Sequence, residues 1–227
     1  MQDTAELETL ASELERKGPE ATVRWALDRF EKVALASSFG LEDVCLVHMA
    51  ATYRKDARIF YLDTDVLFPE TYDVRDRLMD TYKIEFIRVE ASIPLETQAK
   101  EYGDALWSRN PDLCCRLRKV IPLQNFLKNE DAWVTGIRRE QTPARANAKV
   151  VEYDEKFGLV KVNPLAPWTS EDVRAYVDRH HIPYNPLHDK GYPSIGCVPC
   201  TRSVKPGEDP RAGRWAGTDK TECGLHQ

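Results

Sequence analysis

Short apolar runs alternate with helical segments along most of the chain, and this alternation restricts the possible folds more than any other feature of the sequence. Runs of this length fit buried strands, which the sequence predicts at residues 33–37, 58–62, 84–89, 132–136 and 159–162. Helical spacing or start signals predict helices at residues 4–17, 19–31, 41–47, 68–82, 93–107 and 169–180. Strands that alternate with helices form a mostly parallel sheet with helices on both faces, so we predict a five-stranded α/β fold.

Length and composition fit one compact domain. The chain has 227 residues, of which 42% are hydrophobic and 30% charged, values that are ordinary for globular proteins. We expect a single domain over residues 1–227, with an α/β core at 33–182 and an irregular, Pro- and Gly-rich tail at 183–227. No apolar run is long enough for a membrane span and the N-terminus does not resemble a secretory signal, so we expect a cytoplasmic protein.

The charge is distributed unevenly along the chain. Residues 1–113 carry 14 Lys and Arg against 23 Asp and Glu, whereas residues 114–149 carry 8 against 3. A basic region inside an acidic chain suits a small anionic ligand, and the overall balance of −5 makes a nucleic-acid partner a poor fit.

Five of the six cysteines fall into a pattern that predicts a metal site. Cys114 and Cys115 are adjacent, Cys197 and Cys200 form a C-x-x-C pair, and Cys223 stands alone near the end. The two pairs supply the four thiolates that one tetrahedral zinc ion or one iron–sulfur cube needs. If Asn110 and Pro111 begin a helix, Cys114 and Cys115 diverge by roughly 100° around its axis, which favours the wider [4Fe-4S] cube over zinc. Two disulfides are the remaining alternative and are unusual in a reducing cytoplasm.

Polar or glycine-containing turns follow three of the predicted strands. The first contains Ser37, Ser38, Phe39 and Gly40 with Glu42 in the next helix, the second Leu62, Asp63 and Thr64, and the third Gly136, Ile137, Arg138 and Arg139. Ligands of parallel sheets bind beyond the carboxyl ends of the strands, so we expect the three turns to converge on one site. A strand, a Ser/Gly turn and a helix N-terminus can also receive an oxyanion, although the Gly-Lys-Ser/Thr ending of a Walker loop is missing.

These motifs together resemble the assimilatory sulfonucleotide reductases, and specifically their iron–sulfur branch, the adenylyl-sulfate (APS) reductases. The resemblance extends from about residue 33 to the end and is most specific in Cys114-Cys115, in Cys197-x-x-Cys200 and in the run Glu222-Cys223-Gly224-Leu225-His226. It implies a fold like the adenine-nucleotide α-hydrolases. It also implies a reaction in which a cysteine attacks the sulfur of APS, expels AMP and becomes S-sulfocysteine, which thioredoxin then reduces to release sulfite.

The resemblance implies a role for each matching position. It makes Cys223 the nucleophile, gives a [4Fe-4S] cluster to Cys114, Cys115, Cys197 and Cys200, and places Lys119, Arg211 and Arg214 around the phosphosulfate. The turns at 37–42, 62–64 and 136–139 then bind the nucleotide. Cationic neighbours lower the pKa of a thiol, and His226 is a further candidate for this effect on Cys223. We also expect a homo-oligomer.

One position departs from the family pattern, and several alternatives stay open. Asp65 stands where the family usually has glycine after Leu-Asp-Thr. Its carboxylate would repel a 3′-phosphate, which favours APS over phospho-APS (PAPS). The alternatives are a PAPS or dual reductase, a tRNA-thiolating enzyme and a metal-stapled nucleotide sensor. A tRNA-thiolating enzyme would need a Ser-Gly-Gly-x-Asp-Ser turn, which the chain lacks.

Overall fold

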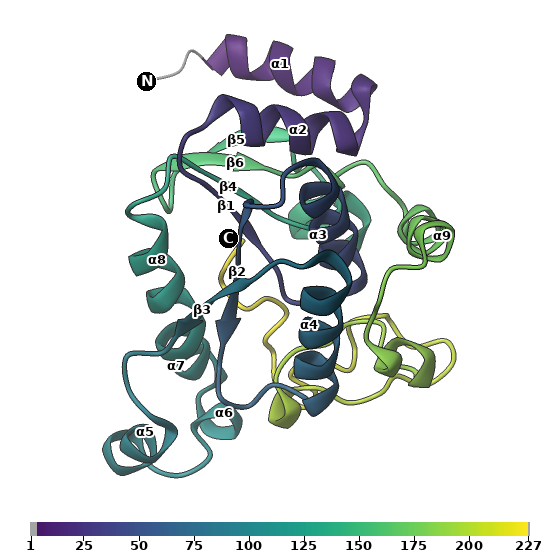
Figure 1. Cartoon of the computed structure of the whole chain (residues 1–227). Helices are drawn as coiled ribbons and strands as arrows, with labels where there is room; N and C mark the ends of the chain where they lie inside the picture. The colour runs from purple at the N-terminus through teal and green to yellow at the C-terminus, as the bar shows by residue number, and fades with distance from the viewer. Residues whose placement is uncertain (1–3, 227) are drawn as a thin grey trace. The chain divides into compact units, whose positions relative to one another are not determined.

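The computed structural model describes residues 4–226 (Figure 1). The chain forms two compact units, each built from three segments. The first unit comprises Met1–Tyr61, Arg77–Ile87 and Leu127–Tyr184, and the second comprises Leu62–Asp76, Arg88–Phe126 and Asn185–Gln227. Within residues 4–226, no helix has both the length and the apolar composition to cross a bilayer.

A six-stranded sheet lies mostly in the first unit, and two of its strands continue into residues of the second. Its strands are β1 (Val33–Ala36), β2 (Arg58–Asp63), β3 (Phe86–Glu90), β4 (Ala132–Val134), β5 (Val151–Asp154) and β6 (Leu159–Val162), in the order β3-β2-β1-β4-β6-β5. The pairs β1–β2, β1–β4 and β4–β6 are parallel, with Leu35 opposite both Ile59 and Val134. β1 and β4 are apolar and almost entirely buried, as expected for central strands of a covered parallel sheet. The predicted α/β class is therefore confirmed.

The prediction of five strands was wrong by one strand. β5 runs antiparallel to β6 at the edge of the sheet, with Val151 opposite Val162, and the two strands form a hairpin. Its sequence Val-Glu-Tyr-Asp alternates in polarity, and Tyr153 is 54% exposed. Four residues of this kind give too short a pattern to stand out from a loop, because only one face of an edge strand contributes apolar residues.

Five α-helices with residues in the first unit are longer than ten residues. They are α1 (Thr4–Lys17), α2 (Pro19–Arg29), α3 (Leu41–Tyr53), α4 (Pro69–Tyr82) and α9 (Ser170–His180). α3 packs on β1, α2 and α9, and this explains why it is apolar on most of its surface, including the fully buried Cys45. Burial raises the pKa of the Cys45 thiol, as expected for an inert core cysteine. At the start of α9, Thr169 and Asp172 form a capping box, in which each side chain accepts a hydrogen bond from the backbone amide of the other residue.

The second unit consists of short helices and irregular chain. It contains α5 (Leu95–Tyr102), α6 (Leu106–Arg109), α7 (Pro111–Cys115), the π-helix η1 (Arg116–Val120), α8 (Ile121–Leu127, at its end) and the 3₁₀ helices η4 (Pro186–Lys190) and η5 (Val198–Cys200). The helix predicted at 93–107 is divided in two at Gly103 and Ala105, which both have positive φ. Two isolated bridges, Leu67 with Cys197 and Thr201 with Arg214, connect segments of this unit that are distant in sequence.

Candidate active site and cysteine pocket

Cys114 and Cys115 lie at the end of α7, where the chain changes helix type. Asn110 caps this helix by accepting a hydrogen bond from the Leu113 amide at 3.0 Å, and Pro111 occupies its first turn, as the sequence predicts. The π-helix η1 follows Cys115 directly. A π-helical turn is wider than an α-helical turn and is frequent at functional sites.

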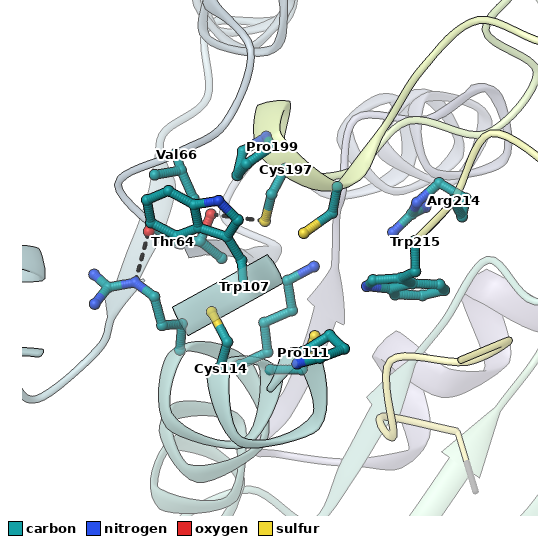
Figure 2. A pocket seen from close by; sticks show the side chains of 13 residues that line it. Thr64, Val66, Trp107, Pro111, Cys114, Cys197, Pro199, Arg214 and Trp215 are labelled. Carbon is teal, nitrogen blue, oxygen red and sulfur yellow. Dashed lines mark hydrogen bonds between the residues drawn. The ribbon is translucent and has the colours of Figure 1, made fainter. Parts of the chain in front are cut away.

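The four cysteines predicted as ligands line one pocket in the second unit (Figure 2). Cys114, Cys115 and Cys197 are buried and Cys200 is half-buried. All six cysteines of the chain lie in the described part, and none of them forms a disulfide. The pocket is lined by Thr64, Val66, Trp107, Pro111, Cys114, Cys115, Arg118, Lys119, Cys197, Pro199, Cys200, Arg214 and Trp215.

The segment after β2 holds the C-x-x-C pair. The Val198 amide donates to the Val66 carbonyl at 2.8 Å, beside the bridge between Leu67 and Cys197. The Thr64 hydroxyl and Cys197 Sγ lie 3.2 Å apart, and Figure 2 shows this contact as a dashed line. The predicted nucleotide turn Leu62-Asp63-Thr64 therefore contributes directly to the cysteine pocket.

The thiols of the pocket influence one another and the neighbouring cations. Burial, reinforced by the other thiols, raises the pKa of Cys114 to about 11 and that of Cys200 to about 12. Arg118 and Lys119 act in the opposite direction on Cys114. Burial disfavours the charged form of Lys119, but Cys197, Cys223 and Cys115 outweigh this effect and raise its pKa. Lys119 therefore stays protonated at the cysteine pocket.

Four thiols around one pocket fit a metal group with four thiolate ligands. Thiols with raised pKa values are costly to ionise in this setting, and a bound cation would provide the missing charge. Among residues 4–226, no three His, Cys, Asp or Glu side chains are grouped closely enough to hold a single ion.

Arg118 is a buried cation whose structural importance the sequence did not indicate. It is 1% exposed and donates hydrogen bonds to the Thr64 carbonyl at 2.7 Å, the Ile93 carbonyl at 3.3 Å and Gln98 Oε1 at 3.2 Å. It also forms an ion pair with Asp65, which has φ 59°. Asp65 is thus bound by an internal cation in the position that the family usually fills with glycine.

Asp63 builds the turn that contains Asp65. Its carboxylate accepts hydrogen bonds from the Asp65 amide at 2.9 Å, Tyr72 Oη at 2.7 Å and Arg88 Nε at 2.7 Å. Burial alone would raise the pKa of Asp63, but these donors hold it below its ordinary value. The carboxylate is therefore charged at neutral pH, and both of its oxygens accept hydrogen bonds.

The Ser37–Gly40 turn in the first unit is closed by an internal carboxylate. Asp43 Oδ2 accepts from the Ser38 amide at 2.5 Å and from Ser38 Oγ at 2.6 Å. Burial raises the pKa of Asp43 to about 6, against the effect of these hydrogen bonds. Phe39 has φ 62°, and its buried ring contacts Tyr61 and Phe86.

The turn after β4 contacts Glu42 and Asp43 at the start of α3. A Cβ atom on Gly136 would lie 2.1 Å from Asp43 Oδ1, so only glycine fits there. Arg138 is buried and forms ion pairs with Glu42 and Glu140, and the buried Ile137 lies next to it. Arg139 binds both carboxylate oxygens of Glu15 in α1, at 2.8 and 2.7 Å. Two of the three predicted nucleotide turns are therefore neighbours, and the third belongs to the second unit.

The tail brings the remaining predicted site residues into the second unit. Arg214 Nη1 donates to Ser194 Oγ at 3.0 Å and to the Ile195 carbonyl at 3.2 Å, and its guanidinium lies 4.6 Å from the centre of the Trp215 ring. Arg211 donates hydrogen bonds to the Thr221 carbonyl and to the Glu222 carboxylate. Cys223 is half-buried and acts electrostatically on Cys115 and Lys119. His226, also half-buried, lies three residues further on.

Comparison with known proteins matches most of this chain to one family. Residues 32–203 match the family described as the phosphoadenosine phosphosulfate reductase domain. The chain is 49% identical over 216 residues to the adenosine 5'-phosphosulfate reductase of Halalkalibacterium halodurans, covering 94% of both chains. It is 46% identical over 222 residues to the reductase of the same name from Salinibacter ruber, covering 97% of this chain and 88% of that one.

A solved structure with the same architecture supports the assignment. The phosphate complex of phosphoadenylyl-sulfate (PAPS) reductase from Candida auris superposes with a TM-score of 0.78 at 31% identity, over 90% of this chain and 98% of that one. The predicted resemblance is confirmed: the chain belongs to the phosphoadenosine phosphosulfate reductase family.

Proposed function

We propose that this protein reduces adenylyl sulfate to sulfite and AMP in assimilatory sulfate reduction. The names of its relatives support this activity, which makes it an oxidoreductase acting on sulfur. The observation that carries the proposal is that Cys223 lies in the same unit as Lys119 and Cys115, and that the next residue passes beside η1, where a Cβ atom on Gly224 would lie 3.7 Å from Val120 Cγ2. A thiol beside a protonated lysine is suited to nucleophilic attack on an anionic sulfonate.

The reaction has two steps in this proposal. The Cys223 thiolate forms a bond to the sulfur of the sulfonate while the bond from sulfur to the phosphate oxygen breaks, and AMP leaves with the electron pair. A dithiol protein, which we propose to be thioredoxin, then attacks Sγ of the S-sulfocysteine and displaces sulfite. Its second thiol resolves the mixed disulfide, so that the dithiol is oxidised and Cys223 returns to the thiol.

Lys119 is the cation that we place closest to the reacting groups. Negative charge moves from the sulfonate to the departing phosphate during the first step, and a fixed cation stabilises that charge in the transition state more than in the ground state. Arg214 lines the same pocket, and we propose that it also faces the phosphosulfate together with Arg211. His226 is a further candidate for activating the Cys223 thiol.

We propose that Cys114, Cys115, Cys197 and Cys200 hold a [4Fe-4S] cluster. When bound, the cluster would supply a fixed charge centre and a covalent link between α7 and the irregular tail. Metal analysis is expected to find about four irons and four sulfides per chain. One zinc ion per chain with no sulfide would contradict this part of the proposal.

The nucleotide half of the substrate would bind the three turns that follow the strands. These are Ser37, Ser38, Phe39, Gly40 and Glu42, then Leu62, Asp63 and Thr64, and finally Gly136, Ile137, Arg138 and Arg139. We further propose one functional reductase domain over 1–227, with a core at 33–182 and a catalytic tail at 183–227, that works as a homo-oligomer in the cytoplasm.

Replacing the nucleophile tests the mechanism. Cys223→Ser keeps the size of the side chain but provides no thiolate at neutral pH, so sulfite release is expected to vanish while AMP binding is retained. Wild-type protein incubated with APS and no reductant is expected to gain one SO₃ group on the peptide that contains Cys223. Turnover by the serine variant, or an adduct on Cys45 or on no cysteine, would contradict the proposal.

PAPS is the second candidate substrate, because the solved relative from Candida auris is a PAPS reductase. The carboxylate of Asp65 is bound by Arg118, with Arg88 Nη2 3.6 Å from its other oxygen. Both cations reduce the repulsion that Asp65 would exert on a 3′-phosphate. Sulfite release measured from APS and from PAPS at equal concentration decides between the two substrates.

A further inference from the structure

The segment that carries Cys223 is anchored at Lys220. Lys220 Nζ forms an ion pair with Asp112 in α7, and its ammonium lies 5.5 Å from the centre of the Trp215 ring. Only 8% of the Lys220 side chain is exposed. The tail is therefore attached at this residue to the helix that ends in Cys114 and Cys115.

A second attachment lies just beyond Lys220. Arg211 Nη2 donates to the Thr221 carbonyl at 3.1 Å and to Glu222 Oε2 at 3.2 Å. The side chain of Glu222 is 5% exposed and that of Arg211 is 18% exposed. Water screens an ion pair so far withdrawn from solvent less than one on the surface, and losing one partner leaves a buried charge behind.

This second attachment holds the residue next to Cys223. Cys223 follows Glu222 directly and acts electrostatically on Cys115 and Lys119. A Cβ atom on Gly224 would lie 3.7 Å from Cγ2 of Val120 in η1, so the chain passes along the π-helix immediately after Cys223. Because Lys220 is anchored independently, breaking the bond between Arg211 and Glu222 would leave the chain before Thr221 attached and loosen the segment that carries Cys223.

We propose that the Arg211–Glu222 ion pair is a clasp that holds Cys223 against the cysteine pocket, and that Glu222 is a positioning residue for the nucleophile. The inference rests on the proposed function of Cys223. The first step needs the thiol beside Lys119, whereas the second needs Sγ of the S-sulfocysteine to be accessible to a protein dithiol. The clasp is closed for the first step and opens about Lys220 for the second.

The rate at which Cys223 reacts with iodoacetamide measures the opening of the clasp without any substrate. Glu222→Gln keeps an acceptor for Arg211 but removes its charge, so Cys223 in the cluster-loaded protein is expected to be alkylated about tenfold faster, as mapped by mass spectrometry. Glu208→Gln is the matched control, because Glu208 pairs with Arg202 at 2.8 Å in the same tail but is more exposed. It is expected to leave the rate unchanged.

The enzymatic reaction separates positioning from general destabilisation. In a single turnover with APS and no reductant, Glu222→Gln is expected to form the SO₃ adduct more slowly while its AMP affinity stays within twofold of wild type. Arg211→Gln, which breaks the same pair from the other side, is expected to reproduce the faster alkylation even if Glu222→Gln does not fold.

The proposal is overturned if Cys223 is alkylated at the wild-type rate in both variants, or if Glu208→Gln accelerates the reaction equally. It is also overturned if neither variant retains its fold and iron, since the pair would then be a general structural element. Alkylation does not involve APS, so a failure of the proposed chemistry would appear as wild-type protein that forms no adduct, with the difference between variants intact.

Discussion

Asp65→Gly tests whether the buried ion pair with Arg118 stabilises the cysteine pocket. The substitution restores the residue that the family usually has and removes the carboxylate bound to Arg118, whose side chain is 2% exposed. Two local effects oppose each other. Glycine removes the strain of the left-handed backbone at φ 59°, which stabilises the folded state by about 1 kcal/mol. It also increases the conformational entropy of the unfolded chain, which destabilises the folded state by about 0.5 to 1 kcal/mol.

These local effects roughly cancel, so the loss of the ion pair decides whether the substitution raises or lowers the free energy of unfolding. Arg118 keeps three neutral acceptors in the variant, the carbonyls of Thr64 and Ile93 and the side chain of Gln98, and therefore is not left without partners. Losing one hydrogen bond between charged groups costs about 1.5 to 3 kcal/mol. At about 2 to 4 °C per kcal/mol for a chain of this size, the midpoint of thermal unfolding is expected to fall by about 3 to 12 °C.

Lys83→Gly is the matched control for the effect of placing glycine at a residue with positive φ. Lys83 also has positive φ, at 54°, but its ion pair with Asp80 joins side chains that are 71% and 84% exposed and contributes little. Its unfolding midpoint, followed by circular dichroism, is expected to stay within about 2 °C of wild type. The reasoning is refuted if Asp65→Gly is as stable as wild type or loses no more than Lys83→Gly.

Two further predictions concern charge at the site. Lys119→Ala is expected to lower turnover by a factor of about a few hundred, because a donor aimed at a transition state contributes on the order of 3 kcal/mol. The AMP affinity, measured by calorimetry, is expected to change much less. Equal losses of turnover and AMP affinity would mean that Lys119 binds the ground state and the transition state equally. Because burial raises the pKa of Asp43 from 3.8 to about 6, the contribution of its protonated form to stability is fully present below pH 3.8 and is lost as pH rises to about 6. The free energy of unfolding in urea is therefore expected to fall for wild type relative to Asp43→Asn between about pH 4 and 6 and to stay level above that range. A difference between the two proteins that does not depend on pH would contradict this.

The sequence predicted the elements whose signals are local. The strand at Val33–Ala36 is a run of apolar residues, and the helix at Pro111–Cys115 begins with a capping Asn and a Pro at its first position. The two cysteine pairs were recognisable from spacing, and the structure brings all four thiols to one pocket. Such features depend on neighbours in the chain, which is why they could be predicted without coordinates.

What the sequence could not predict depends on contacts between distant residues. Arg138 and Arg139 were expected to bind the nucleotide, and the structure pairs them with Glu42 and Glu15, more than ninety positions away. Whether a substrate recruits either guanidinium stays a prediction. The link between Arg211 and Glu222 was also not visible, because nothing in the spacing of the tail distinguishes it from the exposed pair of Arg202 and Glu208.

Two neighbouring cations of the π-helix serve different purposes. Arg118 and Lys119 are consecutive in η1, yet Arg118 binds the turn after β2 through the Thr64 carbonyl, while Lys119 responds to the thiols of Cys197, Cys223 and Cys115. Thr64 in turn lies 3.2 Å from Cys197 through its hydroxyl. Arg118 thus binds the turn that contacts Cys197, and the next residue places a cation at the cysteine pocket. A substitution at Arg118 should therefore disturb the pocket through the position of Cys197 as well as through charge, whereas one at Lys119 should disturb it mainly through charge.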